Sequence, residues 1–286
     1  MRKRLIALDI DGTLLDNARR IPDENIQAIK EAQRAGHMVM ICSGRPHDSL
    51  LTFLKEEGMP DLPVSASNGS LTIVEGKIIH QVSMDLLVVE QLVAFLEKGE
   101  YPYNVFTEEG VVGHSAFLKR SKQALTDNPE QAQAMLARGM DYDGLVKYMA
   151  QVVSNHFTEW QEFPTERSVV KLYIYTPCPE KKAALTTFAA TLPDLTVTSS
   201  FPDNIEISAA AGHKGTGVMA VADYFNIPIA DTVAVGDNFN DKGMFETAGF
   251  GIAMGNAEAE IKELADVVTL PNDEFGVAHA IRTFIL

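Results

Sequence analysis

The sequence predicts an α/β fold: a Rossmann-like core built on a parallel sheet, with an α+β domain inserted into it. Two observations predict the core, namely short apolar runs that end at polar or glycine residues, and amphipathic helical patterns that alternate with them. A third observation, the loss of this alternation in the middle of the chain, predicts the insert.

The strands of the core are predicted by apolar runs in which polar residues do not alternate. Continuous apolar runs are typical of strands buried on both faces, as in a parallel sheet. The runs are Leu5–Leu8, Met38–Cys42, Val64–Ala66, Thr232–Val235 and Gly251–Met254.

The helices of the core follow a period of 3.6 residues. The segment Asp23–Ala35 begins after Pro22 and ends before Gly36, which is a suitable C-terminal cap. The segment Gly215–Asn226 places apolar side chains at i, i+3, i+4 and i+7: Val218, Val221, Ala222 and Phe225. Helices that alternate with strands indicate right-handed crossovers between parallel strands.

The middle of the chain follows a different pattern. A hairpin is predicted around Glu75-Gly76, and helices, strands and a long polar helical stretch at about 115–153 come after it. The further elements predicted there are Asp85–Lys98, Tyr103–Thr107, Val169–Tyr175, Glu180–Leu192, Thr196–Ser199 and Asn204–Ile207. We therefore divide the chain into a core, 1–83 with 206–286, and an inserted α+β domain, 84–205.

Composition excludes several classes of function. The chain has 286 residues, a formal net charge of −15 and a pI of about 4.8, so its surface repels nucleic acid and anionic membranes. An anionic substrate would need a local positive site. The two cysteines are far apart, and the basic N-terminus lacks a cleavage site for a signal peptide. We expect a reduced, cytoplasmic protein that is a monomer or a small homo-oligomer.

The first polar motif, Asp9-Ile10-Asp11-Gly12-Thr13, comes directly after a predicted strand. In an open α/β sheet, ligands bind beyond the carboxyl ends of the strands. Two neighbouring carboxylates attract a hard cation such as Mg²⁺, and they can also act as a nucleophile and a general acid. The alternative is a loop whose aspartates only cap the next turn.

Three further motifs follow in the sequence. Asp237-Asn238-Phe239-Asn240-Asp241 comes after another strand and would meet the first motif at the same sheet edge. Ser43-Gly44 can bind an anion, and Lys214 at the start of a helix can pair with a phosphate. Taken singly, these motifs also fit an Asx-rich turn, a strand-to-helix turn and a surface lysine.

Together and in this order, the four motifs resemble the haloacid dehalogenase superfamily of phosphohydrolases. The resemblance extends to Gly251–Ala257, and the insert is similar to the type IIB cap of Cof-like phosphatases. The resemblance implies a HAD-like core. It also implies that Asp9 is the nucleophile and a metal ligand, that Asp11 is the general acid/base and a metal ligand through its carbonyl, and that Asp237 is the third ligand of Mg²⁺.

The resemblance assigns the remaining site residues to phosphate or substrate binding, apart from Asp241, which is a supporting acid. The phosphate- or substrate-binding residues are Thr13, Ser43, Gly44, Asn68, Lys214 and Asn240. The expected activity is Mg²⁺-dependent hydrolysis of a small phosphorylated metabolite, such as a sugar phosphate or a cofactor phosphate, through an aspartyl-phosphate on Asp9.

Two alternatives use the same residues. A phosphomutase or phosphotransferase would pass the phosphoryl group to an acceptor other than water. A phosphate-responsive binding module would become phosphorylated without turnover. The inserted domain and the second acid Asp11 favour the phosphatase, for which the insert would exclude water and select the leaving group.

Overall fold

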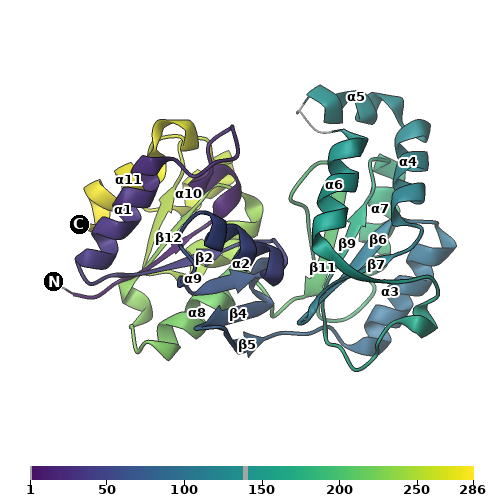
Figure 1. Cartoon of the computed structure of the whole chain (residues 1–286), viewed down its shortest axis with the longest axis horizontal. Coiled ribbons are helices and arrows are strands. Elements are labelled where there is room, and N and C mark those ends of the chain that lie inside the picture. Colours follow the sequence, from purple (N-terminus) through teal and green to yellow (C-terminus); the bar gives the residue numbers. More distant parts are fainter. Residues whose placement is uncertain (1, 138–140) are drawn as a thin grey trace. The chain divides into compact units, whose positions relative to one another are not determined.

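The computed structural model describes residues 2–137 and 141–286, which form two compact units. One unit consists of Met1–Gln81 and Gly212–Leu286, and the other consists of Val82–Ala211. Figure 1 shows a sheet with covering helices in each unit. The division of the chain at 84 and 205, made from the sequence, stays a prediction about domain organisation.

The first unit contains an eight-stranded sheet in the order β14-β13-β12-β1-β2-β3-β4-β5. The strands from β14 to β3 are parallel, and β4 and β5 add an antiparallel hairpin. The bounds are β1 Leu5–Leu8, β2 Met38–Cys42, β3 Val64–Ala66, β4 Leu71–Val74, β5 Lys77–Gln81, β12 Thr232–Gly236, β13 Phe250–Ala253 and β14 Val267–Val268.

The strand order alone indicates where this sheet would bind a ligand. From β1 the chain moves outward through β2 and β3, and it later returns to the other side of β1 at β12. The sheet therefore reverses its direction of growth between β1 and β12. At such a switch point, ligands bind in the crevice outside the carboxyl ends of the strands.

Helices cover this sheet because each has one apolar face. The helix α1 packs with α11, and α8 packs with α9 (Figure 1). Their buried side chains include Ala28, Ile29 and Ala32 of α1, and Val218, Val221 and Ala222 of α8. The bounds are α1 Asp23–Arg34, α2 His47–Glu56, α8 Lys214–Tyr224, α9 Lys242–Thr247, α10 Ala259–Leu264 and α11 Gly276–Ala280.

The second unit has a six-stranded mixed sheet in the order β10-β11-β9-β6-β7-β8. Its helices α3 and α7 contact each other and contribute to one apolar core together with the sheet. The bounds are β6 Tyr103–Thr107, β7 Gly110–His114, β8 Val153–Phe157, β9 Val169–Tyr175, β10 Leu195–Thr198, β11 Asn204–Ala209, α3 Leu86–Lys98, α4 Phe117–Asp127, α5 Pro129–Ala137, α6 Tyr142–Val152 and α7 Pro179–Ala189.

The long helical stretch predicted at 115–153 consists of the separate helices α4, α5 and α6, and part of it, 138–140, lies outside the described residues. Asn128 and Pro129 separate α4 from α5, because Pro129 cannot donate the backbone hydrogen bond that would continue α4. The prediction of a helical stretch is confirmed for the described residues, and the structure divides that stretch into α4, α5 and α6.

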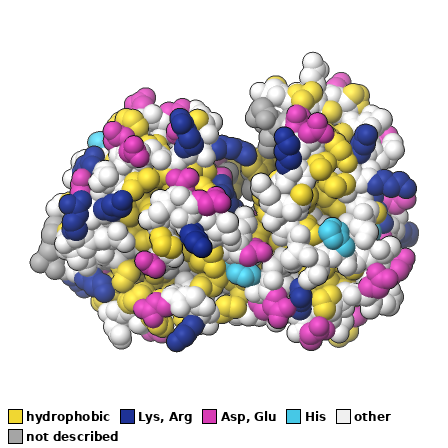
Figure 2. Space-filling view, viewed as in Figure 1, with side chains coloured by type: hydrophobic (Ala, Val, Ile, Leu, Met, Phe, Trp, Pro, Cys, Tyr) yellow, Lys and Arg dark blue, Asp and Glu magenta, His cyan; other side chains and the backbone are white. Residues whose placement is uncertain are grey.

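On the face drawn in Figure 2, acidic and basic side chains are interspersed among hydrophobic and other side chains. The net charge of −15 is therefore not gathered into one acidic patch on that face. Among the described residues, no helix has the length and apolar character that a membrane span requires.

Candidate active site

Asp9 and Asp237 follow directly after β1 and β12, the two strands that border the switch point. The parallel pairing of these strands continues into the loop, where the backbone N–H of Asp9 donates to the carbonyl of Val235 at 3.0 Å. Thr13 Oγ1 donates to Oδ1 of Asp237 at 2.6 Å. The prediction that the two acidic motifs meet at one sheet edge is confirmed by this geometry.

Gly12 permits this close approach of the two loops. Its φ is +90°, a left-handed conformation that favours glycine, and an added Cβ would lie 2.3 Å from Oδ2 of Asp237. Any larger residue at position 12 would strain the backbone and also push the Asp237 carboxylate away.

Lys214 joins Asp9 to a third carboxylate. The Lys214 side chain is fully buried, and its Nζ donates to Oδ1 of Asp9 and, at 2.5 Å, to Oδ1 of Asp241. Oδ2 of Asp241 accepts from the backbone N–H groups of Asp237 and Asn238 at 2.9 and 3.0 Å. Both oxygens of Asp241 are thus bonded, so this residue fixes Lys214 and the Asp237 loop in place.

Burial sets the proton affinity of this cluster. Burial raises the pKa of Asp9 well above its ordinary value; the charge of Asp241 adds to this effect, and the Lys214 ammonium opposes it only in part. Burial, followed by the charge of Asp241, also raises the pKa of Asp237 to about 7. Burial alone would lower the pKa of Lys214, but Asp241 and Asp9 outweigh it and hold that pKa above its ordinary value. The single positive charge of Lys214 therefore does not neutralise the charge of the three carboxylates.

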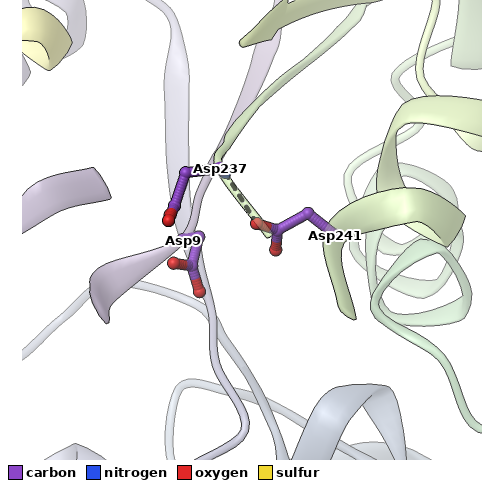
Figure 3. Close-up of side chains that lie close together, drawn as sticks. All are labelled: Asp9, Asp237 and Asp241. Atoms are coloured by element: carbon purple, nitrogen blue, oxygen red, sulfur yellow. Dashed lines mark hydrogen bonds between the residues drawn. The ribbon is translucent and has the colours of Figure 1, made fainter. Parts of the chain in front are cut away.

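The cluster fits a divalent cation. One carboxylate oxygen from each of Asp9, Asp237 and Asp241 lies within 4.8 Å of the others, and Figure 3 shows the three side chains turned toward one another. Carboxylate oxygens are the ligands that Mg²⁺ prefers, and a cation would neutralise the surplus negative charge. Because both oxygens of Asp241 are already bonded, Asp9 and Asp237 are the better placed of the three to act as ligands.

The residues predicted to bind phosphate gather beside this cluster. The N–H of Asn68 donates to the carbonyl of Ser43 at 3.0 Å, and Asn240 Nδ2 donates to Oδ1 of Asn68 at 3.3 Å. A Cβ on Gly44 would lie 2.8 Å from Asn68 Oδ1, so these residues are tightly packed. Asn68 adopts a left-handed conformation with φ of +59°, which asparagine tolerates better than most residues do.

The Asp11 side chain is exposed, unlike those of the buried cluster, and it binds a residue to which no role was assigned from the sequence. Arg45 Nε and Nη2 donate to the two carboxylate oxygens of Asp11 at 3.0 and 2.8 Å. The Arg45 guanidinium also lies 4.8 Å from the centre of the Phe53 ring. Arg45 belongs to the predicted anion-binding turn, but its partner is 34 residues away, and only the fold brings the two together.

Comparison with known proteins identifies the family. A model of haloacid dehalogenase-like hydrolases matches residues 6–281, which is nearly the whole chain. The chain belongs to the haloacid dehalogenase-like hydrolases. The family predicted from the four motifs is therefore confirmed, as are the α/β fold and the assignment to hydrolytic enzymes.

Similar members of this family cover the full length of the chain. The phosphatase YwpJ of Bacillus subtilis is 33% identical over 98% of this chain and 99% of its own length. The 5-amino-6-(5-phospho-D-ribitylamino)uracil phosphatase YwtE of Bacillus subtilis is 30% identical over 97% of this chain and 96% of its own. The solved structure of the HAD subclass IIB sugar phosphatase BT4131 matches 99% of both chains with a TM-score of 0.79 at 23% identity, a likeness of fold.

Proposed function

We propose that this protein is a Mg²⁺-dependent phosphomonoesterase that hydrolyses a small phosphorylated metabolite through a phosphoryl group transferred to Asp9. The observation that carries the proposal is the position of Asp9. Its carboxylate follows the central strand β1, contacts the Lys214 ammonium, and shares a buried acidic cluster with Asp237. The chain belongs to the haloacid dehalogenase-like hydrolases, and the relatives that are similar to it are named phosphatases, which supports the same activity.

Asp9 and Asp237 would hold the Mg²⁺ ion, with the backbone carbonyl of Asp11 as a further ligand. When bound, the ion neutralises negative charge on the carboxylates and the phosphate, which favours the approach of two anions. The protein's own contribution is to position the groups that react and to keep them buried.

The first step transfers the phosphoryl group to the protein. A carboxylate oxygen of Asp9 forms a bond to phosphorus as the bond from phosphorus to the leaving oxygen breaks. Asp11 donates a proton to that oxygen, so the leaving group departs as an alcohol. Lys214, which contacts Asp9, would bind the oxygens of the phosphoryl group together with Ser43 and Asn68, which are hydrogen-bonded to each other.

The second step restores the protein. Asp11, now a carboxylate, takes a proton from a water molecule, and the water oxygen attacks phosphorus. The bond between phosphorus and the Asp9 oxygen breaks, and inorganic phosphate is released. Arg45 binds both oxygens of Asp11 and would orient it for these two proton transfers.

The experiment that tests the proposal measures phosphate release from a panel of substrates. The panel contains sugar phosphates, nucleotides, pyridoxal phosphate, flavin mononucleotide and 5-amino-6-(5-phospho-D-ribitylamino)uracil. Each compound is assayed with Mg²⁺, with EDTA, and with the Asp9→Asn variant, which keeps the shape of the side chain but not its nucleophilic charge. We expect release that requires both the metal ion and Asp9.

Two results would contradict the proposal. Release that persists undiminished in Asp9→Asn would exclude Asp9 as the nucleophile. Absence of release from every compound, together with a phosphorylated Asp9 seen by mass spectrometry, would indicate transfer to another acceptor or a phosphate-responsive module.

A further inference from the structure

One short segment of the C-terminal part binds both acidic loops of the site. The N–H of Met254 donates to the carbonyl of Gly236 at 3.0 Å, and the N–H of Glu258 donates to the carbonyl of Asp237 at 3.0 Å. Between them, Asn256 Nδ2 donates to the carbonyl of Gly12 at 2.8 Å. The segment Met254–Glu258 therefore spans the distance between the loop after β12 and the loop after β1.

The Asn256 side chain is held at its other end as well. Its Oδ1 accepts from the N–H of Asn272 at 2.9 Å. Asn272 is buried, and its Nδ2 donates to the carbonyl of Leu15 at 2.9 Å, just beyond the motif that begins at Asp9. Two asparagines of the C-terminal part thus bind one carbonyl within the first acidic motif and one just beyond it.

We propose that Asn256 is a positioning residue, which sets the spacing between the loop that carries Asp11 and Gly12 and the loop that carries Asp237. This inference rests on the proposed function, because it assigns Asn256 to the same reaction. The role follows from the amide, which donates to one loop and accepts from the segment after β14. Asn256 lies in Gly251–Ala257, a motif of the family resemblance to which the mechanism gives no task.

The loop that carries Gly12 and the loop that carries Asp237 cannot move closer together without a steric clash. A Cβ on Gly12 would lie 2.3 Å from the Asp237 carboxylate, so the loops already meet at van der Waals distance. A displacement of reacting groups by about 1 Å can slow a reaction by about a hundredfold. Asn256 is itself exposed, and a single exposed hydrogen bond contributes little to overall stability. Loss of this bond should therefore affect catalysis much more than folding.

The experiment compares Asn256→Ala and Asn256→Asp with a matched control. The Asp variant keeps the acceptor for Asn272 and loses the donor for Gly12. Asn128 makes the same kind of bond, from its Nδ2 to the carbonyl of Ala124 at 2.8 Å, in the second unit, so Asn128→Ala and Asn128→Asp serve as controls. The readouts are kcat, KM, the midpoint of thermal unfolding and hydrogen exchange of the peptide that covers residues 10–17.

We expect both Asn256 variants to lower kcat by about tenfold or more while KM changes by less than about threefold. The unfolding midpoint should stay that of the unaltered protein, and exchange in residues 10–17 should become faster than in either Asn128 variant. Faster exchange there supports the positioning role even if the panel shows no phosphatase activity, so failure of the proposed function is distinguished from failure of this inference.

Two outcomes would overturn the inference. One is unchanged kcat and unchanged exchange in residues 10–17 in both Asn256 variants. The other is a loss of kcat accompanied by an equal loss of unfolding stability and by faster exchange throughout the first unit, which would make Asn256 a residue of general structural importance.

Discussion

At the scale of single residues, Asp241 controls the arrangement of the other charged groups. Its two oxygens bind the Lys214 ammonium on one side and two backbone N–H groups on the other. A buried carboxylate with such partners does not need to touch the substrate to be essential. It keeps Lys214 beside Asp9 and fixes the loop that presents Asp237.

We predict that Asp241→Asn lowers turnover strongly and destabilises the protein. An asparagine that keeps its oxygen toward the two backbone N–H groups must turn its NH₂ group toward the Lys214 ammonium, and one buried donor then loses its acceptor. The loss should lower the free energy of unfolding by about 1–3 kcal/mol. Urea unfolding and the phosphatase assay measure the two effects.

Glu31→Gln provides the control for that variant, because Glu31 pairs with Arg282 at the surface. We expect its unfolding curve and its turnover to match those of the unaltered protein, since exposed ion pairs contribute little. Equal behaviour of the two variants would mean that Asp241 is not a structural centre of the site.

We expect the free energy of unfolding to depend on pH, because the buried carboxylates of the site lie close together. The pKa of Asp237 is raised from 3.8 to about 7 in the folded protein, so the folded chain binds this proton more tightly than the unfolded chain does. The resulting stabilisation is complete below pH 3.8 and is lost as the pH rises through about 7. We therefore predict that the protein in EDTA becomes less stable over this range, as measured by urea unfolding at a series of pH values.

Two comparisons test that interpretation. Mg²⁺ should stabilise the protein more above pH 7 than below it, because a cation competes with the proton for the same oxygens. Asp237→Asn should show a smaller loss of stability with pH, since its amide does not titrate. If Asp237→Asn keeps the full pH dependence, the loss of stability arises elsewhere in the molecule.

At the scale of elements, the helix α8 packs unusually close to the sheet. A Cβ on Gly217 would lie 1.9 Å from Oγ of Ser65 in β3. We predict that Gly217→Ala destabilises the protein by about 1–3 kcal/mol, because overpacking forces the backbone to shift. The shift should also lower turnover, since Lys214 begins the same helix. Urea unfolding and the phosphatase assay test both parts.

Gly144 in α6 is the control for Gly217, because it is also a glycine within a helix. The nearest atom to a Cβ there is the side-chain oxygen Oδ1 of Asp141, at 3.1 Å. Gly144→Ala should leave stability unchanged or raise it by up to about 1 kcal/mol, as expected for alanine in a helix. A similar loss in both variants would show that helix propensity, rather than the contact with Ser65, decides the result.

Elements with a strong apolar signal were predictable from the sequence, and elements with a weak one were not. The strands β6 and β9 have the predicted bounds, and β1, β2 and β3 follow the apolar runs. The strand β8 was missed because it lies at the edge of its sheet, where its residues Ser154, Asn155 and His156 are exposed and polar. The strand propensity of these residues does not indicate that the segment will pair with β7.

The same distinction applies to the site. The two acidic motifs could be predicted because each follows an apolar strand, and parallel strands bring their carboxyl ends together. Arg45 and Asn256 were not assigned, since their partners Asp11 and Gly12 lie 34 and 244 residues away. Which arginine or asparagine reaches a given loop depends on packing that no local pattern contains.

At the scale of the whole molecule, the second unit has a hydrophobic core of its own. Every residue of that cluster, from Met84 to Ala209, belongs to Val82–Ala211. We predict that a fragment of residues 82–211 folds cooperatively by itself, because independent cores are the property that defines domains. Circular dichroism during urea unfolding and the dispersion of amide signals in NMR spectra would test this. A fragment without a sigmoidal transition would show that its core depends on the rest of the chain.

The central place of β1 has a consequence for biosynthesis. β1 is synthesised before the second unit, whereas its neighbour β12, which begins at Thr232, is synthesised after it. Until then Leu5–Leu8 lacks one of the two strands that bury it, and Asp9 has neither Asp237 nor Lys214 beside it. The nascent chain therefore cannot assemble the acidic cluster early, because the cluster is completed only after Asp241 has emerged from the ribosome.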